Sequence, residues 1–353
     1  MFFGLRPKGF NFTNNVRWLP GRSGLHFEKY SIAYTKLDKI QEEKNWQGKG
    51  IFSTEIAIEP EVIDSGEFRV ILSFYGGEER DQIIIGQWRS YIIIMSGDDY
   101  AHKNKTWRFE AKMAVSILEP VFISLTSGQN GANLYINGQL VKSLEDPVVL
   151  PNGEHMQLTL ANSVYGQHSW QGNILGASFY AHELNPESIK SHFNRWAITK
   201  KFDTGNDANP MLNYLFDEKD GAVVVNNAGM NYPLIIPAWM HLFKKTVLAN
   251  PLTGFEFNRC FIGDVIINFI GFMPLGFCLC AIFVAFGKSN RTQAILLSTG
   301  LCFMISLGIE IAQAWIPSRS SQLMDVLMNT LGALAGAKIE NIKQLRAVTK
   351  AML

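Results

Sequence analysis

The chain has 353 residues, which is enough for two domains. Its formal net charge at pH 7 is only +1, and no basic stripe runs through the N-terminal part, so the composition argues against a nucleic-acid-binding protein. All four cysteines lie between residues 260 and 302 and show no metal-ligand spacing. The sequence therefore predicts no disulfide framework for the N-terminal part, no metal site and no cofactor.

Seven runs of apolar, β-branched or aromatic residues predict short β-strands in the N-terminal part. Glycine-containing turn signals separate the runs, and Asn137-Gly138 predicts a type I′ hairpin turn because both residues tolerate positive φ. Strands at this spacing predict an antiparallel two-sheet sandwich. The runs are Ile51–Ile58, Phe68–Phe74, Gln82–Trp88, Tyr91–Met95, Val121–Thr126, Ala132–Ile136 and Gln157–Ala161.

One helix is predicted in this part of the chain, over Asn185–Ala197. Asn185 can accept a hydrogen bond as the N-cap residue, and Pro186 fits the first turn because no amide donor is needed there. Glu187 is favoured near the positive end of the helix dipole.

An ordered set of short motifs resembles the laminin G-like, concanavalin A-like jelly roll over about residues 22–225. The motifs are Leu134-Tyr135-Ile136-Asn137-Gly138, Trp170-Gln171-Gly172-Asn173-Ile174, Ser178-Phe179-Tyr180 and Leu184. The resemblance implies an all-β jelly roll with a carbohydrate or a protein as ligand, or a scaffold without a ligand of its own. We expect Trp88 and Trp170 to lie in the core, and Asp98-Asp99 to form a turn instead of a calcium site.

Three apolar stretches in the C-terminal part predict membrane-spanning helices. Val265–Phe286 has 22 residues without a charge, and Ala294–Trp315 carries a single charged residue. Val326–Ala337 has 12 uncharged residues, and it can span if the helix begins a few residues earlier and Lys338 snorkels to the interface.

Polar residues recur inside or beside these stretches, where they are costly and usually have a function or a partner. An Asp-x-x-x-Asn pattern occurs twice, and its two members share one helix face. If there are three spans, polar residues from all of them can converge within about 10 Å of one interface. The predicted ligand-binding residues of this pocket are Asp264, Asn268, Glu310, Gln313, Arg319, Asp325 and Asn329.

The distribution of basic residues predicts an orientation in the membrane. Six lysines and arginines lie in the first short loop and after the last span, against four on the other side. Because basic segments tend to stay in the cytoplasm, we expect a cytoplasmic C-terminus and a jelly roll on the outer, periplasmic or extracellular, side of the inner or plasma membrane.

The polar pattern also resembles the VanZ-like membrane family over about residues 233–340. The matching residues are Asp264-x3-Asn268-x2-Gly271-x2-Pro274-Leu275-Gly276-Phe277, Ser306-x3-Glu310-x2-Gln313, Pro317-x-Arg319 and Asp325-x3-Asn329-x2-Gly332. The resemblance implies a membrane protein of the bacterial cell envelope, linked to polysaccharide or cell-wall processes or to glycopeptide (teicoplanin) resistance, and it supplies no reaction. Family members usually carry a membrane helix ahead of this region. Residues 1–7 resemble the end of one, so we expect a start further upstream or a truncated chain.

We therefore expect a multidomain protein, with an all-β jelly-roll sandwich followed by an α-helical membrane domain of three spans. The stretch 234–249 is too interrupted to span and is predicted to lie at the membrane interface. Gly332-x3-Gly336 predicts a close contact between two helices. The expected divisions are an N-terminal segment 1–21, the jelly roll 22–225, a linker and interfacial segment 226–259, the VanZ-like domain 260–345 and a cytoplasmic tail 346–353.

Three functions are open for the polar pocket, and the sequence favours the first. A non-enzymatic protein would bind a membrane lipid or a lipid-linked glycan there, with Arg319 pairing a phosphate. An intramembrane enzyme would instead use Asp264, Glu310 and Asp325 as acid, base or metal ligands on a lipid-linked substrate. As a third alternative, the polar residues would only cap and join the helices.

Overall fold

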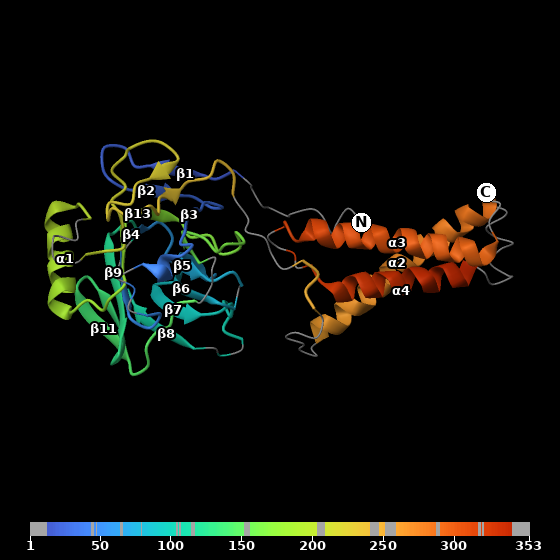
Figure 1. Ribbon diagram of the computed structural model, residues 1–353, viewed down its shortest axis with the longest axis horizontal. Coiled ribbons are helices and arrows are strands. Elements are labelled where there is room, and N and C mark those ends of the chain that lie inside the picture. Colours follow the sequence, from blue (N-terminus) through green and yellow to red (C-terminus); the bar gives the residue numbers. More distant parts are fainter. Residues whose placement is uncertain are drawn as a thin grey trace. The chain divides into compact units, whose positions relative to one another are not determined.

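The computed structural model contains two compact units (Figure 1). One unit comprises Phe10–His241, and the other comprises Met1–Gly9 with Leu242–Leu353. The structure describes residues 13–43, 46, 48–63, 66–78, 80–103, 105, 107–113, 117–151, 156–202, 209–240, 247–250, 259–286, 290–316, 319 and 321–340. The N-terminal helix remnant expected at residues 1–7 and the tail expected at 346–353 lie outside the described residues.

The first unit is an antiparallel β-sandwich, which confirms the predicted fold class for this part of the chain. One sheet has the strand order β1-β2-β13-β4-β9-β10-β11, with β14 also paired to β13. Its strands are β1 Val16–Trp18, β2 Leu25–Phe27, β4 Phe52–Pro60, β9 Val121–Gly128, β10 Gly131–Ile136, β11 Gln139–Leu144, β13 Gly172–Tyr180 and β14 Leu212–Tyr214. The central strand β13 lies between β2 and β4, so segments that are far apart in the sequence make up the middle of this sheet.

The second sheet has the strand order β15-β16-β3-β12-β5-β6-β7-β8. Its strands are β3 Ala33–Lys36, β5 Arg69–Tyr75, β6 Gln82–Trp88, β7 Tyr91–Ser96, β8 Arg108–Lys112, β12 Gln157–Leu160, β15 Val223–Val224 and β16 Leu234–Ile235. A short 3₁₀ helix at Ile40–Glu42 follows β3. The main core lies between the two sheets and includes Phe52, Phe74 and Phe179, whose rings pack against one another.

The seven predicted strands all occur, as β4, β5, β6, β7, β9, β10 and β12. The predicted hairpin turn is also confirmed, because Asn137 and Gly138 connect β10 to β11 with φ values of 52° and 72°. The sandwich extends beyond residue 225, where we expected a linker to begin. Leu234 in β16 is fully buried, and β16 pairs with β3.

Helix α1 (Pro186–Thr199) packs on the outer face of the first sheet (Figure 1). The Asn185 side chain accepts a hydrogen bond from the Ser188 amide at 2.8 Å, so the predicted N-cap is confirmed. On its inner side, the His192 Nδ1 atom lies 2.9 Å from Oε2 of Glu55, a fully buried residue of β4. The Tyr180 hydroxyl donates to the same carboxylate oxygen at 2.9 Å. Glu55 therefore joins the helix to the sheet through its contact with His192, and it bonds to the neighbouring strand β13 through Tyr180.

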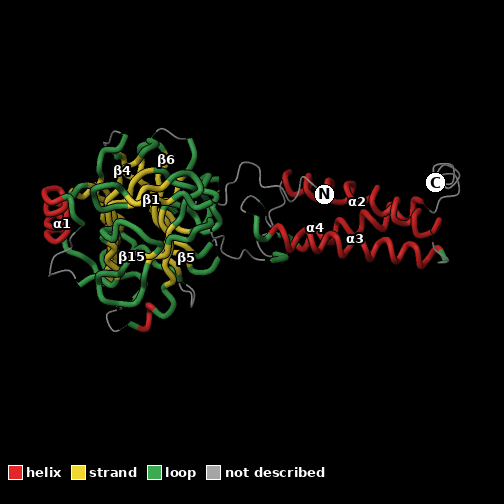
Figure 2. Tube along the Cα trace, turned by 90° about the horizontal axis from the view of Figure 1, so that it is seen from above, coloured by secondary structure: helices red, strands yellow, loops and turns green. Residues whose placement is uncertain are grey.

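The second unit contains three long helices that run alongside one another (Figure 2). They are α2 (Arg259–Phe286), α3 (Arg291–Gln313) and α4 (Leu323–Glu340). Among the described residues, two segments are long and apolar enough to cross a membrane, Ile262–Ala285 and Arg291–Gln313. Two of the three predicted spans are thus candidates by length and composition, and the expected third span is a shorter helix, α4.

We predict that Glu55→Ala lowers the free energy of unfolding of the sandwich by about 3–5 kcal/mol, because it leaves His192 and Tyr180 buried without their shared acceptor. Urea unfolding of the full chain in detergent, followed by tryptophan fluorescence, measures the change. Glu61→Ala is the matched control, since Glu61 is exposed just beyond the end of β4. Equal unfolding midpoints for the two variants would contradict the role given to Glu55.

Candidate functional site

Glycines bring α2 and α4 into close contact. A Cβ atom at Gly332 would overlap the backbone carbonyl of Phe269, and one at Gly336 would overlap that of Met273. The contact predicted from Gly332-x3-Gly336 is therefore confirmed. Because the contacting residues rise together along both helices, α2 and α4 run in the same direction.

This packing places the two Asp-x-x-x-Asn patterns side by side. Asn268 of α2 hydrogen-bonds the Asp325 carboxylate of α4, and Asp264 lies near enough to interact with the same carboxylate electrostatically. Asp264 is exposed, whereas Asn268 and Asp325 are half-buried. Two carboxyl groups and one amide therefore meet where α2 and α4 begin.

Glu310 of α3 belongs to the same cluster. Its side chain interacts electrostatically with Asp325, and the residue is only 2% exposed. The Gln322 backbone amide donates to Glu310 Oε2 at 2.9 Å. The loop that carries Gln322 is also held from the other side, because Ala249 forms backbone hydrogen bonds with Ser321 and Leu323. Glu310 thus fixes the connection between α3 and α4.

Asn329 joins α4 to α3 one turn further along. Its Nδ2 atom donates to the Ser306 hydroxyl at 2.9 Å, and both residues are buried. The Asn329 Oδ1 atom is buried and has no hydrogen-bond partner within the described part of the chain. Buried oxygens without a donor are uncommon in folded proteins.

The structure brings together five of the seven predicted residues, with Ser306 as a sixth member. We call Asp264, Asn268, Ser306, Glu310, Asp325 and Asn329 the polar cluster. Gln313 is the half-buried last residue of α3, and Arg319 is exposed in the following loop, where its backbone amide donates to the Ile316 carbonyl. Among the described residues, no group of three or more His, Cys, Asp or Glu side chains is placed to hold a metal ion.

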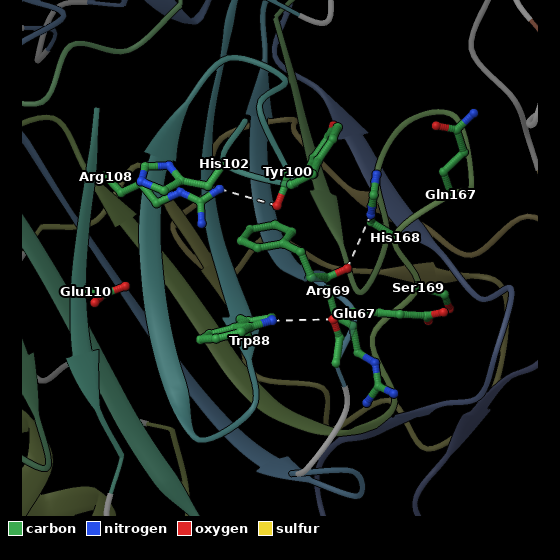
Figure 3. A pocket seen from close by; sticks show the side chains of 13 residues that line it. Glu67, Arg69, Trp88, Tyr100, His102, Arg108, Glu110, Gln167, His168 and Ser169 are labelled. Carbon is green, nitrogen blue, oxygen red and sulfur yellow. Dashed lines mark hydrogen bonds between the residues drawn. The ribbon is translucent and has the colours of Figure 1, made fainter. Parts of the chain in front are cut away.

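The sandwich carries a pocket of about 650 Å³ that the sequence did not indicate (Figure 3). It lies on the side of the second sheet that faces away from the main core, where Val70, Ile84, Ile93 and Met95 form a separate apolar layer. Its lining residues are Gly66, Glu67, Phe68, Arg69, Trp88, Tyr100, Ala101, His102, Arg108, Glu110, Gln167, His168 and Ser169.

Trp88 corrects one of our expectations. Trp170 is fully buried in the core as predicted, and its indole nitrogen donates to Gln87 at 2.7 Å. Trp88 is half-buried and lines the pocket instead, because alternate residues of β6 face opposite sides of the sheet. Asp98-Asp99 forms the predicted turn, with the Asp99 carboxylate accepting from the Lys103 amide at 2.8 Å.

Aromatic rings from three separate segments form the apolar part of the pocket. Tyr100 stacks on His168 with ring centroids 3.7 Å apart, and Phe68 packs against Tyr100 at 5.7 Å. The Phe68 carbonyl accepts a hydrogen bond from His168 Nδ1 at 3.2 Å, and burial lowers the pKa of His168. The sequence could not indicate this pocket, since loops bring its residues together from positions 66 to 169.

Comparison with known proteins finds one matching family. Residues 211–343 match the VanZ/LLP1 family model. The match begins within the last strands of the sandwich and includes all three helices of the VanZ/LLP1 region, together with every residue of the polar cluster. No curated protein matches the chain.

Three solved structures are similar to the chain. A protein from Bacteroides ovatus described as carbohydrate-binding has 12% identity and a TM-score of 0.44, covering 64% of this chain and 58% of its own. The CBM40 of Ruminococcus gnavus IT-sialidase bound to α2,3-sialyllactose has 12% identity and a TM-score of 0.38, covering 48% and 96%. Trypanosoma rangeli sialidase has 13% identity and a TM-score of 0.39, covering 51% and 28%. Similarity at this level assigns no ligand to this chain.

We predict that Gly332→Leu separates α2 from α4, since the leucine would overlap the Phe269 backbone. The free energy of unfolding in detergent should fall by roughly 3 kcal/mol or more, and the melting temperature should fall with it. Gly300→Leu is the matched control, because a Cβ there meets no atom within 4 Å. The two melting temperatures are compared by differential scanning fluorimetry. A similar melting temperature for both variants would argue against the close helix contact.

We predict that neutral His168 stabilises the sandwich above pH 6.5 and that this contribution is lost as the pH falls below that value. The reason is that burial lowers the pKa of His168 in the folded state, so the unfolded chain binds the proton more readily. Urea midpoints measured between pH 7.5 and pH 5 should fall more steeply for the wild type than for His168→Phe. Parallel pH profiles would refute the assignment to His168.

Proposed function

We propose that the chain is an integral membrane protein of the bacterial cell envelope, and that its polar cluster binds the headgroup of a membrane lipid or lipid-linked glycan. The observation that carries the proposal is the unpartnered Oδ1 atom of Asn329, which is buried beside Ser306. Its position between helices of the VanZ/LLP1 region supports a ligand there, because a buried oxygen without a donor is destabilising.

The charges of the polar cluster favour a ligand rich in hydrogen-bond donors. Asp264, Glu310 and Asp325 are all carboxyl residues, and their mutual repulsion disfavours a bare anion beside them. Hydroxyl or amino groups would satisfy these carboxylates and the Asn329 oxygen together. A phosphate of the same ligand would have to lie further out, towards Arg319, which is exposed.

The direction of α4 supports a third passage through the membrane. α4 runs parallel to α2, and its 18 residues give a length of about 27 Å, close to the thickness of the hydrocarbon core. With three spans, the basic residues of the first loop and of the C-terminal end lie on one side. The positive-inside tendency then favours a cytoplasmic C-terminus, with the sandwich and the polar cluster towards the outer side.

Catalysis by the clustered carboxyl groups is the second candidate. The proximity of Asp264, Glu310 and Asp325 favours it, since coupled carboxyl groups can act as an acid and base pair. Binding remains the better supported function, because the carboxylates of Glu310 and Asp325 already accept hydrogen bonds that hold the loop and the helices.

We predict that Glu310→Gln abolishes retention of a co-purifying lipid while leaving the melting temperature within a few degrees of the wild type. The glutamine oxygen can still accept from the Gln322 amide, so the loop is kept, but one ligand-binding carboxylate is removed. Native mass spectrometry in mild detergent measures the bound lipid, with at least a tenfold lower occupancy expected for the variant.

Glu340→Gln is the matched control. Like Glu310, Glu340 is a buried carboxyl residue. It lies on α4, 15 residues beyond Asp325, which is about 22 Å along the helix and away from the polar cluster. Retained lipid in Glu310→Gln would contradict the proposed site. A large loss of stability in that variant would favour a purely structural role for the polar cluster.

A further inference from the structure

The pocket of the sandwich has the size and composition of a ligand site. Its volume of about 650 Å³ falls within the range usual for small-molecule sites. Its floor is aromatic and fixed, because a Cβ atom at Gly86 would overlap the Phe68 ring, which therefore rests directly on the strand backbone of β6. Trp88, two residues further along β6, stands beside that ring on the same face.

Tyr100 and His168 stack on each other, and the Phe68 ring is inclined to both. Phe68 makes an angle of 50° with Tyr100 and of 76° with His168. Tyr100 and His168 are already in direct contact, so they leave no slot between them for a flat heterocycle. Inclined rings suit a puckered ring that presents C–H groups to several aromatic faces.

Polar groups at the rim supply both donors and acceptors. In the view of Figure 3, Arg108 and His102 stand on one side and Gln167 and His168 on the other. Arg108 Nη2 donates to the Asp99 carbonyl at 2.6 Å and to that of Tyr100 at 3.3 Å. Its Nε atom is buried without a partner in the described part of the chain.

The charges of the lining balance. Two arginines, Arg69 and Arg108, stand against two exposed glutamates, Glu67 and Glu110. Burial favours the neutral form of His168 by lowering its pKa, so this residue adds no fixed charge. A strongly anionic ligand would meet two carboxylates, and a cationic one would meet two guanidinium groups. The lining therefore matches a neutral ligand with many hydroxyl groups.

We infer that this pocket binds a neutral saccharide. The sugar ring packs its C–H face against Trp88, which Phe68 supports from below, while Arg108 and Glu110 hydrogen-bond its hydroxyl groups. This site is separate from the polar cluster of the helices. It gives the sandwich a ligand of its own instead of a purely structural role.

The test is glycan-array binding of the labelled full-length protein in detergent, with arrays that hold neutral and acidic glycans, followed by calorimetric titration of the best neutral oligosaccharide. We expect binding to neutral glycans, weakened about tenfold or more by Trp88→Ala. Trp107→Ala is the matched control, since Trp107 is 38% exposed next to Arg108 but does not line the pocket. It should bind as the wild type does.

Glu110→Gln provides a second variant in case Trp88→Ala does not fold. Glu110 is exposed on β8, so its replacement should leave the melting temperature unchanged and weaken binding several-fold. Binding of acidic glycans alone, no glycan binding at all, or equal affinities for the Trp107 and pocket variants would overturn the inference. Glu310→Gln should bind the array as the wild type does, so a failure of the polar-cluster proposal stays distinguishable from a failure here.

Discussion

The close contact between α2 and α4 is the constraint on which the helical unit depends. Gly332 and Gly336 allow the backbones to touch, so the carbonyl groups of Phe269 and Met273 occupy space that any side chain would fill. Among lipid tails there is little hydrophobic gain from bringing helices together. Close packing and hydrogen bonds must therefore stabilise the helix assembly. The same contact sets the register in which Asn268 meets Asp325.

The residues of the polar cluster join the three helices, and the proposed function gives the same residues a ligand. Glu310 holds the loop at Gln322, and Asn329 holds Ser306, so each polar group contributes to the helix assembly. The three carboxyl groups of the cluster, on Asp264, Glu310 and Asp325, lie close together, which is costly in an apolar environment. Most of these groups have hydrogen-bond partners, but the Asn329 Oδ1 atom is buried without one. Helix assembly alone does not explain this unpartnered oxygen.

In the sandwich, each sheet has two apolar faces, so the outer face of each sheet must also be covered. α1 covers the outer face of the first sheet, joined to it by Glu55 and His192. The second sheet has no helix on its outer face among the described residues, and Phe68 and Tyr100 from its loops cover the apolar layer there. Loops leave a hollow where a helix would fill the space, and the pocket follows from this difference.

The sequence by itself determined the local elements. Alternating apolar residues gave the strands, Asn137-Gly138 gave a hairpin, and uninterrupted apolar runs gave α2 and α3, because each of these depends on neighbours within a few residues. The spacing of Asp264, Asn268, Asp325 and Asn329 also indicated a shared helix face. Only the tertiary structure decided that Asn268 pairs with Asp325, that Ser306 joins the cluster, and that Trp88 faces a pocket instead of the core. Those outcomes depend on which distant segments pack together. When a sheet is buried on both faces, its strands are apolar throughout, so the local sequence does not show which side chains face the core.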